Sequence, residues 1–221
     1  MFQNLLFDLD GTLTDSAEGI TKCVQYALSS FGIIEPDLKK LYPYIGPPLR
    51  ASFQTFHNLS PEQAEIGLKK YRERYEKIGI WENRVFPGML KLLAELKEHG
   101  FRLGMATGKP EVHARRIAER FGLSAYLTDI SGCGLGPKDD GKTEVVATAL
   151  KKWGLFTPEE KATCLMIGDR KEDVMSAHAC GIACLGAGFG FGSRKELENA
   201  GADYYVHDIA ELRSFLISQR P

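Results

Sequence analysis

The sequence lacks the features that mark membrane-spanning, nucleic-acid-binding and disulfide-rich proteins. No run among its 221 residues approaches the ~18 uninterrupted apolar residues that a membrane helix needs. A formal net charge of -1 provides no basic surface for nucleic acid or an anionic membrane, so we expect neither as a partner. The five cysteines include no C-x-x-C pair, which argues against a disulfide scaffold and a structural zinc site.

The N-terminus also lacks the basic start and long apolar run of a secretory signal, which predicts a cytoplasmic protein. Hydrophobic residues make up 43% of the chain and charged residues 26%, the balance of an ordinary soluble globular protein. The length exceeds one typical domain and falls short of two, which favours one core domain with a smaller inserted piece. These features leave the oligomeric state open.

Hydrophobic periodicity divides the chain into three parts. Residues 4–9, Asn-Leu-Leu-Phe-Asp-Leu, favour a short buried strand. From about 16 to 85 the apolar positions follow helical spacing alone. After Phe86-Pro87-Gly88, strands alternate with amphipathic helices. The expected strands span 102–107, 126–131, 163–168, 182–186 and 203–206, and the expected helices span 89–99, 111–121, 143–153, 171–180 and 208–218.

This alternation predicts an α/β fold, a Rossmann-like open parallel sheet core with an inserted all-helical domain. The core comprises residues 1–15 and 86–221, and the insertion comprises residues 16–85. Within the insertion, Ser60-Pro61-x-Gln63 predicts the start of a helix. Ligands of such sheets bind beyond the carboxyl ends of the strands, so functional side chains are expected there.

Two aspartates follow the first strand. Asp8 and Asp10 are two residues apart, so on an extended chain both side chains project into the mouth of the sheet. Two like charges at one place need a reason. The alternative is a hairpin in which Asp10-Gly11 is the turn and residues 12–14 are the return strand. That alternative leaves Asp8 unexplained.

A second acidic pair follows the strand at 163–168. Asp169 and Asp173 are candidates to join Asp8 and Asp10 at one edge of the sheet. The alternative is that Asp169 caps the next helix and Asp173 favours its positive end. Four converging carboxylates repel one another unless a cation lies among them. Oxygen ligands select a hard ion, so the pattern predicts a Mg²⁺ site.

Two further strand ends carry groups that suit an anion. Thr107 offers a hydroxyl and Gly108 a backbone N–H at the end of the strand 102–107. Lys142 stands at a helix start, where the helix dipole disfavours a cation, so its placement suggests a bound anion. The alternatives are a plain helix cap at Thr107 and a solvated lysine at 142.

These motifs, in this order, resemble the haloacid dehalogenase-like superfamily of phosphohydrolases. Its first to fourth motifs are similar, in turn, to Asp8-Leu9-Asp10-Gly11-Thr12, to Thr107-Gly108, to Lys142 and to Gly168-Asp169-x-x-x-Asp173. The helical segment 16–85 resembles the family's cap, and Ile45–Leu49 resembles the phosphoglycolate phosphatase and nucleotidase branch. One departure is that Thr143-Glu144 follows Lys142 where the family often has a proline-containing helix start, which keeps Lys138 as a second candidate for the same role.

The resemblance implies a Mg²⁺-dependent phosphatase acting on a small phosphorylated metabolite, with phosphoglycolate and nucleoside monophosphates as leading candidates. It implies that Asp8 attacks phosphorus and that Asp10 protonates the leaving alcohol and later activates water. Mg²⁺ would be held by Asp8, the backbone carbonyl of Asp10 and Asp169, with Asp173 near the metal. Thr107, Gly108 and Lys142 would hold the phosphoryl oxygens.

Substrate choice is expected to come from the cap. Arg50 begins a short helix after a proline-rich loop, and Tyr44 lies in that loop. The guanidinium of Arg50 suits a second acidic group of the substrate, and the ring of Tyr44 suits a base or sugar. The alternative is that Arg50 is a solvated surface residue and Tyr44 a packing residue.

Three other functions remain open. The segment Gly136–Thr143 matches G-x-x-x-x-G-K-[ST], the phosphate loop of nucleotide hydrolases, although it does not follow an apolar strand directly. A phosphosugar mutase of the same fold would return the phosphate to its sugar. A catalytically silent binding protein is the third, and the filled catalytic positions count against it.

Overall fold

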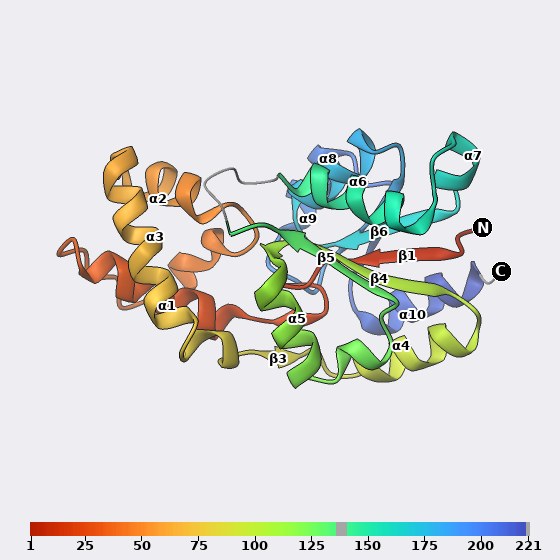
Figure 1. Ribbon diagram of the computed structural model, residues 1–221, viewed down its shortest axis with the longest axis horizontal. Helices are drawn as coiled ribbons and strands as arrows, with labels where there is room; N and C mark the ends of the chain where they lie inside the picture. Colours follow the sequence, from red (N-terminus) through yellow and green to blue (C-terminus); the bar gives the residue numbers. More distant parts are fainter. Residues whose placement is uncertain (136–140, 220–221) are drawn as a thin grey trace. The chain divides into compact units, whose positions relative to one another are not determined.

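The computed structural model describes residues 1–135 and 141–219. It divides into two compact units, one of residues 1–14 and 85–221 and one of residues 15–84. The first unit holds a parallel sheet flanked by helices, and the second is helical (Figure 1).

Six parallel strands form the sheet of the first unit within the described part of the chain. Their order is β5-β4-β1-β6-β7-β8, so β1 lies between β4 and β6. The register aligns Leu5 of β1 with Leu103 and Leu165. All four residues of β1 are buried, as expected for the short buried strand predicted at 4–9. The strands are β1 (Asn4–Phe7), β4 (Arg102–Pro110), β5 (Asp129–Cys133), β6 (Cys164–Gly168), β7 (Ala183–Ala187) and β8 (Tyr204–Val206).

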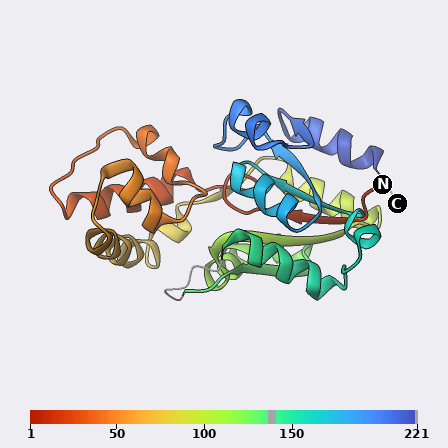
Figure 2. The ribbon, with the colours of Figure 1, turned by 90° about the horizontal axis from the view of Figure 1, so that it is seen from above.

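Helices cover both faces of this sheet (Figure 1, Figure 2). One face carries α6 (Lys142–Trp153), α8 (Lys171–Ala179) and α9 (Arg194–Ala200), which share an apolar core with strand residues such as Leu6 and Met166. The other face carries α4 (Met89–Glu98), α5 (Glu111–Arg120) and α10 (Ile209–Ser218). The α/β fold with an open parallel sheet is therefore confirmed.

Some elements differ from the sequence prediction. The predicted strand at 126–131 begins only at Asp129, because η3 (Leu123–Ala125) forms a 3₁₀ turn before it. The helices α7 (Pro158–Lys161) and α9 are not predicted. Each is too short for a clear apolar period, with no buried residue in α7 and only Leu197 in α9.

The second unit is built on α1 (Ala17–Ser29) packed against α3 (Pro61–Tyr75). The predicted start of α3 is confirmed, since Ser60 and Gln63 form a capping box. The close approach of Gly19 to η2 requires glycine, because a Cβ there would lie 2.1 Å from the Gly79 carbonyl oxygen. The remaining elements are η1 (Leu38–Tyr44), α2 (Leu49–His57) and η2 (Gly79–Trp81).

Two short strands mark the places where the chain passes between the units. β2 (Thr14–Asp15) pairs with β3 (Arg84–Val85), a pairing that purely helical spacing up to residue 85 does not predict. The hairpin alternative for Asp10-Gly11 is wrong, because the segment after the turn pairs with β3 while β4 and β6 occupy both edges of β1. Within the described residues, no helix has the length and apolar character needed to cross a bilayer.

Candidate active site

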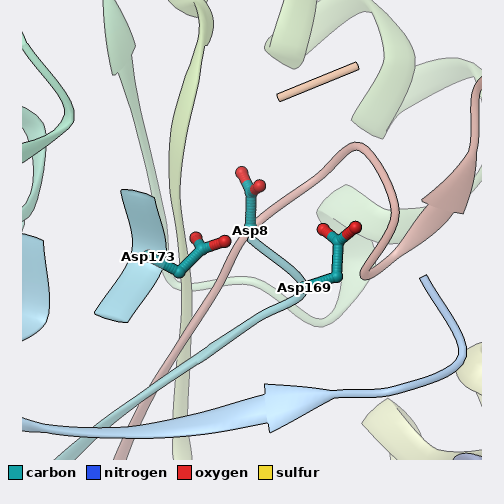
Figure 3. Close-up of side chains that lie close together, drawn as sticks. All are labelled: Asp8, Asp169 and Asp173. Atoms are coloured by element: carbon teal, nitrogen blue, oxygen red, sulfur yellow. The ribbon is translucent and has the colours of Figure 1, made fainter. Parts of the chain in front are cut away.

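Three aspartates meet at the carboxyl ends of β1 and β6 (Figure 3). Asp8 follows β1 directly, Asp169 follows β6, and Asp173 lies in the first turn of α8. Each offers a carboxylate oxygen, and these oxygens lie within 4.8 Å of one another. All three side chains are buried, and Asp169 and Asp173 are fully inaccessible.

Strand pairing and one glycine bring these carboxylates together. Asp8 donates its backbone N–H to the Ile167 carbonyl at 2.9 Å, which places the ends of β1 and β6 side by side. A Cβ on Gly168 would lie 2.0 Å from the carboxyl carbon of Asp173. Only glycine at position 168 therefore lets the Asp173 carboxylate lie against the end of β6.

Asp169 is held by backbone donors from a loop far along the chain. Its Oδ2 accepts from the Phe191 N–H at 2.7 Å and the Gly192 N–H at 3.4 Å, and Thr12 donates its hydroxyl to Oδ1 at 3.4 Å. Burial raises the pKa of Asp169 well above its usual range, and the carboxylates of Asp173 and Asp8 raise it further. The Phe191 N–H opposes this rise in part.

Lys142, the first residue of α6, supplies a buried cation to the cluster. Its Nζ lies 2.8 Å from Asp8 Oδ2 and also contacts Asp173. Burial favours the neutral amine, but the carboxylates of Asp173 and Asp8 outweigh it and raise the pKa of Lys142. Burial, partly offset by the Lys142 cation, raises the pKa of Asp173 to about 7. Lys142 is therefore charged and faces carboxylates.

Asp10 lies outside the three-carboxylate cluster. Its Oδ2 accepts a hydrogen bond from Lys109 Nζ at 2.7 Å, whereas its Oδ1 is buried and has no hydrogen-bond partner among the described residues. Of the four carboxylates predicted to converge, those of Asp8, Asp169 and Asp173 lie together and that of Asp10 does not. The sequence pattern gives no signal for Lys109 beyond its place in the motif Thr107–Pro110.

Thr107 and Gly108 lie near the carboxyl end of β4, the strand next to β1. Thr107 is buried, and its hydroxyl accepts from the Lys109 N–H at 3.2 Å. Gly108 is exposed. β4 continues to Pro110 with a register shift after Thr107, so the helix α5 begins at Glu111 and not directly after the threonine. Both residues are thus placed at the same sheet edge as Asp8.

The cluster suits a hard divalent cation. Its donors are all carboxylate oxygens, and Asp8 Oδ1 is buried with no hydrogen-bond partner in the described part of the protein. Buried anionic oxygens without donors are costly unless a cation pairs with them. Oxygen donors of this kind are the ligands that Mg²⁺ prefers.

Comparison with known proteins gives the family. The model of the haloacid dehalogenase-like hydrolases matches residues 5–187, which include the three clustered aspartates. The chain belongs to this family. The family prediction made from the motifs is confirmed, and the protein is a phosphatase of small phosphorylated substrates.

Relatives of this hydrolase carry several names. A 5'-nucleotidase of Pseudomonas aeruginosa is 43% identical over 98% of this chain and 96% of its own. Tyrosine-protein kinase PtkA of Mycobacterium tuberculosis is 35% identical over 97% of this chain and 72% of its own. The crystal structure of a predicted phosphatase from Clostridium acetobutylicum superposes with a TM-score of 0.93 at 40% identity, covering 99% of each chain.

The two candidate specificity residues of this hydrolase have partners within the helical unit. Arg50 forms an ion pair with Glu65 of α3. Tyr44 is 2% exposed, and its hydroxyl lies 2.6 Å from His57 Nδ1. A substrate would have to compete with Glu65 for the guanidinium, and the Tyr44 ring offers no open face for stacking. Their contact with substrate stays a prediction.

The phosphate-loop alternative at Gly136–Thr143 includes residues 136–140, which lie outside the described residues. The same holds for Lys138, the second candidate for the role of Lys142. Membership of the hydrolase family favours the aspartate-centred site over that alternative.

Proposed function

We propose that this protein is a Mg²⁺-dependent phosphatase that hydrolyses nucleoside 5'-monophosphates through an aspartyl-phosphate on Asp8. The observation that carries the proposal is the different surroundings of the two Asp8 carboxylate oxygens. Lys142 holds Oδ2 at 2.8 Å, while Oδ1 is buried with no hydrogen-bond partner among the described residues. An anionic oxygen kept in place without a donor is suited to attack phosphorus.

In the first step, Asp8 Oδ1 forms a bond to phosphorus as the bond from phosphorus to the 5'-oxygen breaks. Asp10 gives a proton to that oxygen, so the nucleoside leaves as a neutral alcohol. Thr107, the Gly108 N–H and Lys142 hold the phosphoryl oxygens, where the negative charge is concentrated.

In the second step, water attacks the phosphorus of the aspartyl-phosphate and transfers a proton to Asp10. The bond from phosphorus to Asp8 breaks, which frees inorganic phosphate and restores both carboxyl groups. Asp8, Asp169 and Asp173, with the backbone carbonyl of Asp10, would hold Mg²⁺. When bound, the ion supplies positive charge that reduces repulsion between the carboxylate and the phosphate.

The substrate class rests on the 5'-nucleotidase relative, whose 43% identity extends over nearly the whole of both chains. Phosphoglycolate stays the second candidate. A mutase would return the phosphoryl group to its substrate, so release of inorganic phosphate distinguishes hydrolysis from that activity.

The test is phosphate release from a panel of nucleoside 5'-monophosphates and phosphoglycolate with Mg²⁺ present. Asp8→Asn removes the attacking oxygen with little change in volume, so turnover should fall below about 10⁻³ of the wild-type rate. The control is Asp129→Asn, which changes an aspartate at the amino end of β5, the opposite edge of the sheet. An Asp8→Asn protein that kept a tenth of the activity would rule out the aspartyl-phosphate.

A further inference from the structure

We infer that Lys109 is a positioning residue that orients Asp10 for proton transfer to the leaving group. The inference rests on the proposed function of Asp10 as the proton donor. It assigns a role to a side chain outside the three-aspartate cluster and outside the phosphoryl-binding set of Thr107, Gly108 and Lys142.

The ion pair between these residues is short and largely shielded from water. Lys109 Nζ lies 2.7 Å from Asp10 Oδ2, and the two side chains are 6% and 11% exposed. Exposed ion pairs hold a side chain weakly because water and salt compete for both partners. Little of that competition reaches this pair, so it can fix the Asp10 carboxylate in one orientation.

The backbone at the end of β4 places Lys109 for this contact. The register shift after Thr107 interrupts the ladder, and the Lys109 N–H then donates to the Thr107 hydroxyl at 3.2 Å. β5 approaches closely here, since a Cβ on Gly132 would lie 2.6 Å from the Lys109 carbonyl oxygen. The lysine therefore extends from the last residues of β4, where the backbone is held by the Thr107 hydroxyl and packs closely against β5.

Asp10 repeats the arrangement of Asp8. Lys142 Nζ lies 2.8 Å from Asp8 Oδ2, and Lys109 Nζ lies 2.7 Å from Asp10 Oδ2. In both aspartates Oδ1 is buried and has no hydrogen-bond partner among the described residues. For Asp8 the open oxygen is the proposed nucleophile. By the same geometry, Oδ1 of Asp10 is the oxygen that carries the proton to the leaving alcohol.

A lysine at this place could instead bind the phosphoryl group directly. The two roles predict different dependences on the leaving group. Loss of a phosphoryl contact slows every phosphate ester alike. Loss of a proton donor's orientation slows only esters whose leaving group needs a proton, such as a nucleotide, and spares p-nitrophenyl phosphate.

The experiment measures kcat/KM for a 5'-nucleotide and for aryl phosphates of graded leaving-group acidity. This constant reports the steps up to and including formation of the aspartyl-phosphate. Lys109→Met keeps the side-chain length but removes the cation. We expect kcat/KM for the nucleotide to fall at least about thirtyfold and that for p-nitrophenyl phosphate by about threefold or less, because misorientation of the donor affects proton transfer alone. The control is Lys97→Met, which changes an exposed lysine that donates a hydrogen bond to the Ala125 carbonyl.

Two further variants complete the test. Lys109→Arg keeps a cation and should restore part of the nucleotide activity, and Lys109→Gln keeps a donor to Oδ2 if Lys109→Met does not fold. Adding Lys109→Met to Asp10→Asn should change the burst rate with p-nitrophenyl phosphate by less than about twofold, because Lys109 acts through Asp10.

Equal losses on all esters, together with weaker inhibition by orthovanadate, would overturn the inference and make Lys109 a phosphoryl ligand. The same result leaves the proposed function intact as long as Asp8→Asn is inactive. Activity of Asp8→Asn would instead refute the proposed function, whatever the Lys109 variants do.

Discussion

Addition of Mg²⁺ to the metal-free protein should raise its unfolding temperature, and loss of Asp169 should remove most of that rise. The perturbation acts on the three carboxylates of Asp8, Asp169 and Asp173. Lys142 contacts two of them, and when all three carboxylates are ionised their negative charge exceeds the single positive charge of this lysine.

The size of the effect follows from the geometry. Two carboxylate charges at 4.8 Å repel by about 3.5 kcal/mol at an effective dielectric constant near 20, and each pair in the cluster is at least this close. A cation that binds only the folded state at about one hundred times its Kd adds ~2.7 kcal/mol to the free energy of unfolding. For a chain of 221 residues this corresponds to a rise of about 5–10 °C.

The assay is thermal unfolding followed by circular dichroism, first in EDTA and then with millimolar MgCl₂, at constant ionic strength. Asp169→Asn is the test variant, and Glu119→Gln, which changes an exposed carboxylate of α5, is the control. The control should keep the full rise. An equal rise in wild type and Asp169→Asn, or none in wild type, would refute the assignment of the cluster as a cation site.

Three other predictions concern positions around the site and in the helical unit. Gly11→Ala should lower phosphatase activity at least about tenfold, because φ is +83° there and the new Cβ would lie 2.3 Å from Asp169 Oδ2; wild-type kinetics in this variant would contradict the packing. Thr107→Val should lower kcat/KM about a hundredfold through loss of a donor to the phosphoryl group, with the unfolding temperature unchanged, and an unaltered kcat/KM would exclude that contact. Arg74→Met should lower the free energy of unfolding by about 1–2 kcal/mol in urea titrations, because Arg74 makes two hydrogen bonds of 2.7 and 3.0 Å to Glu82; an unchanged midpoint would show the pair to be neutral.

The local sequence determines the strands and helices that have strong periodic signals. A strand buried on both faces is rich in consecutive apolar residues, such as Leu5, Leu6 and Phe7 in β1, and this is how β1 and β6 (Cys164–Gly168) are predicted. The start of α3 is predicted because Ser60 and Gln63 are close in sequence and satisfy one another's backbone groups. Two-residue strands such as Arg84–Val85 carry no such period and are missed.

The sequence alone also places Asp8 and Asp169 at one edge of the sheet, because the carboxyl ends of parallel strands share an edge. Their motifs identify the family because the residues expected to carry the chemistry are few and come directly after strands. What those carboxylates contact is decided elsewhere. Lys109 and Asp10 are 99 positions apart, and the donors of Asp169 come from Phe191 and Gly192.

Contacts over such distances depend on strand order, on the register shift at the end of β4 and on how closely glycines let the backbone approach. None of these features produces a periodic pattern in the amino-acid sequence. The sequence therefore determines which acidic groups lie at the site, and only the tertiary structure decides that Lys109 holds Asp10 while Lys142 joins Asp8 to Asp173. The physical reason is that pairing of buried charges depends on distances in space, which the folded chain sets and sequence spacing does not.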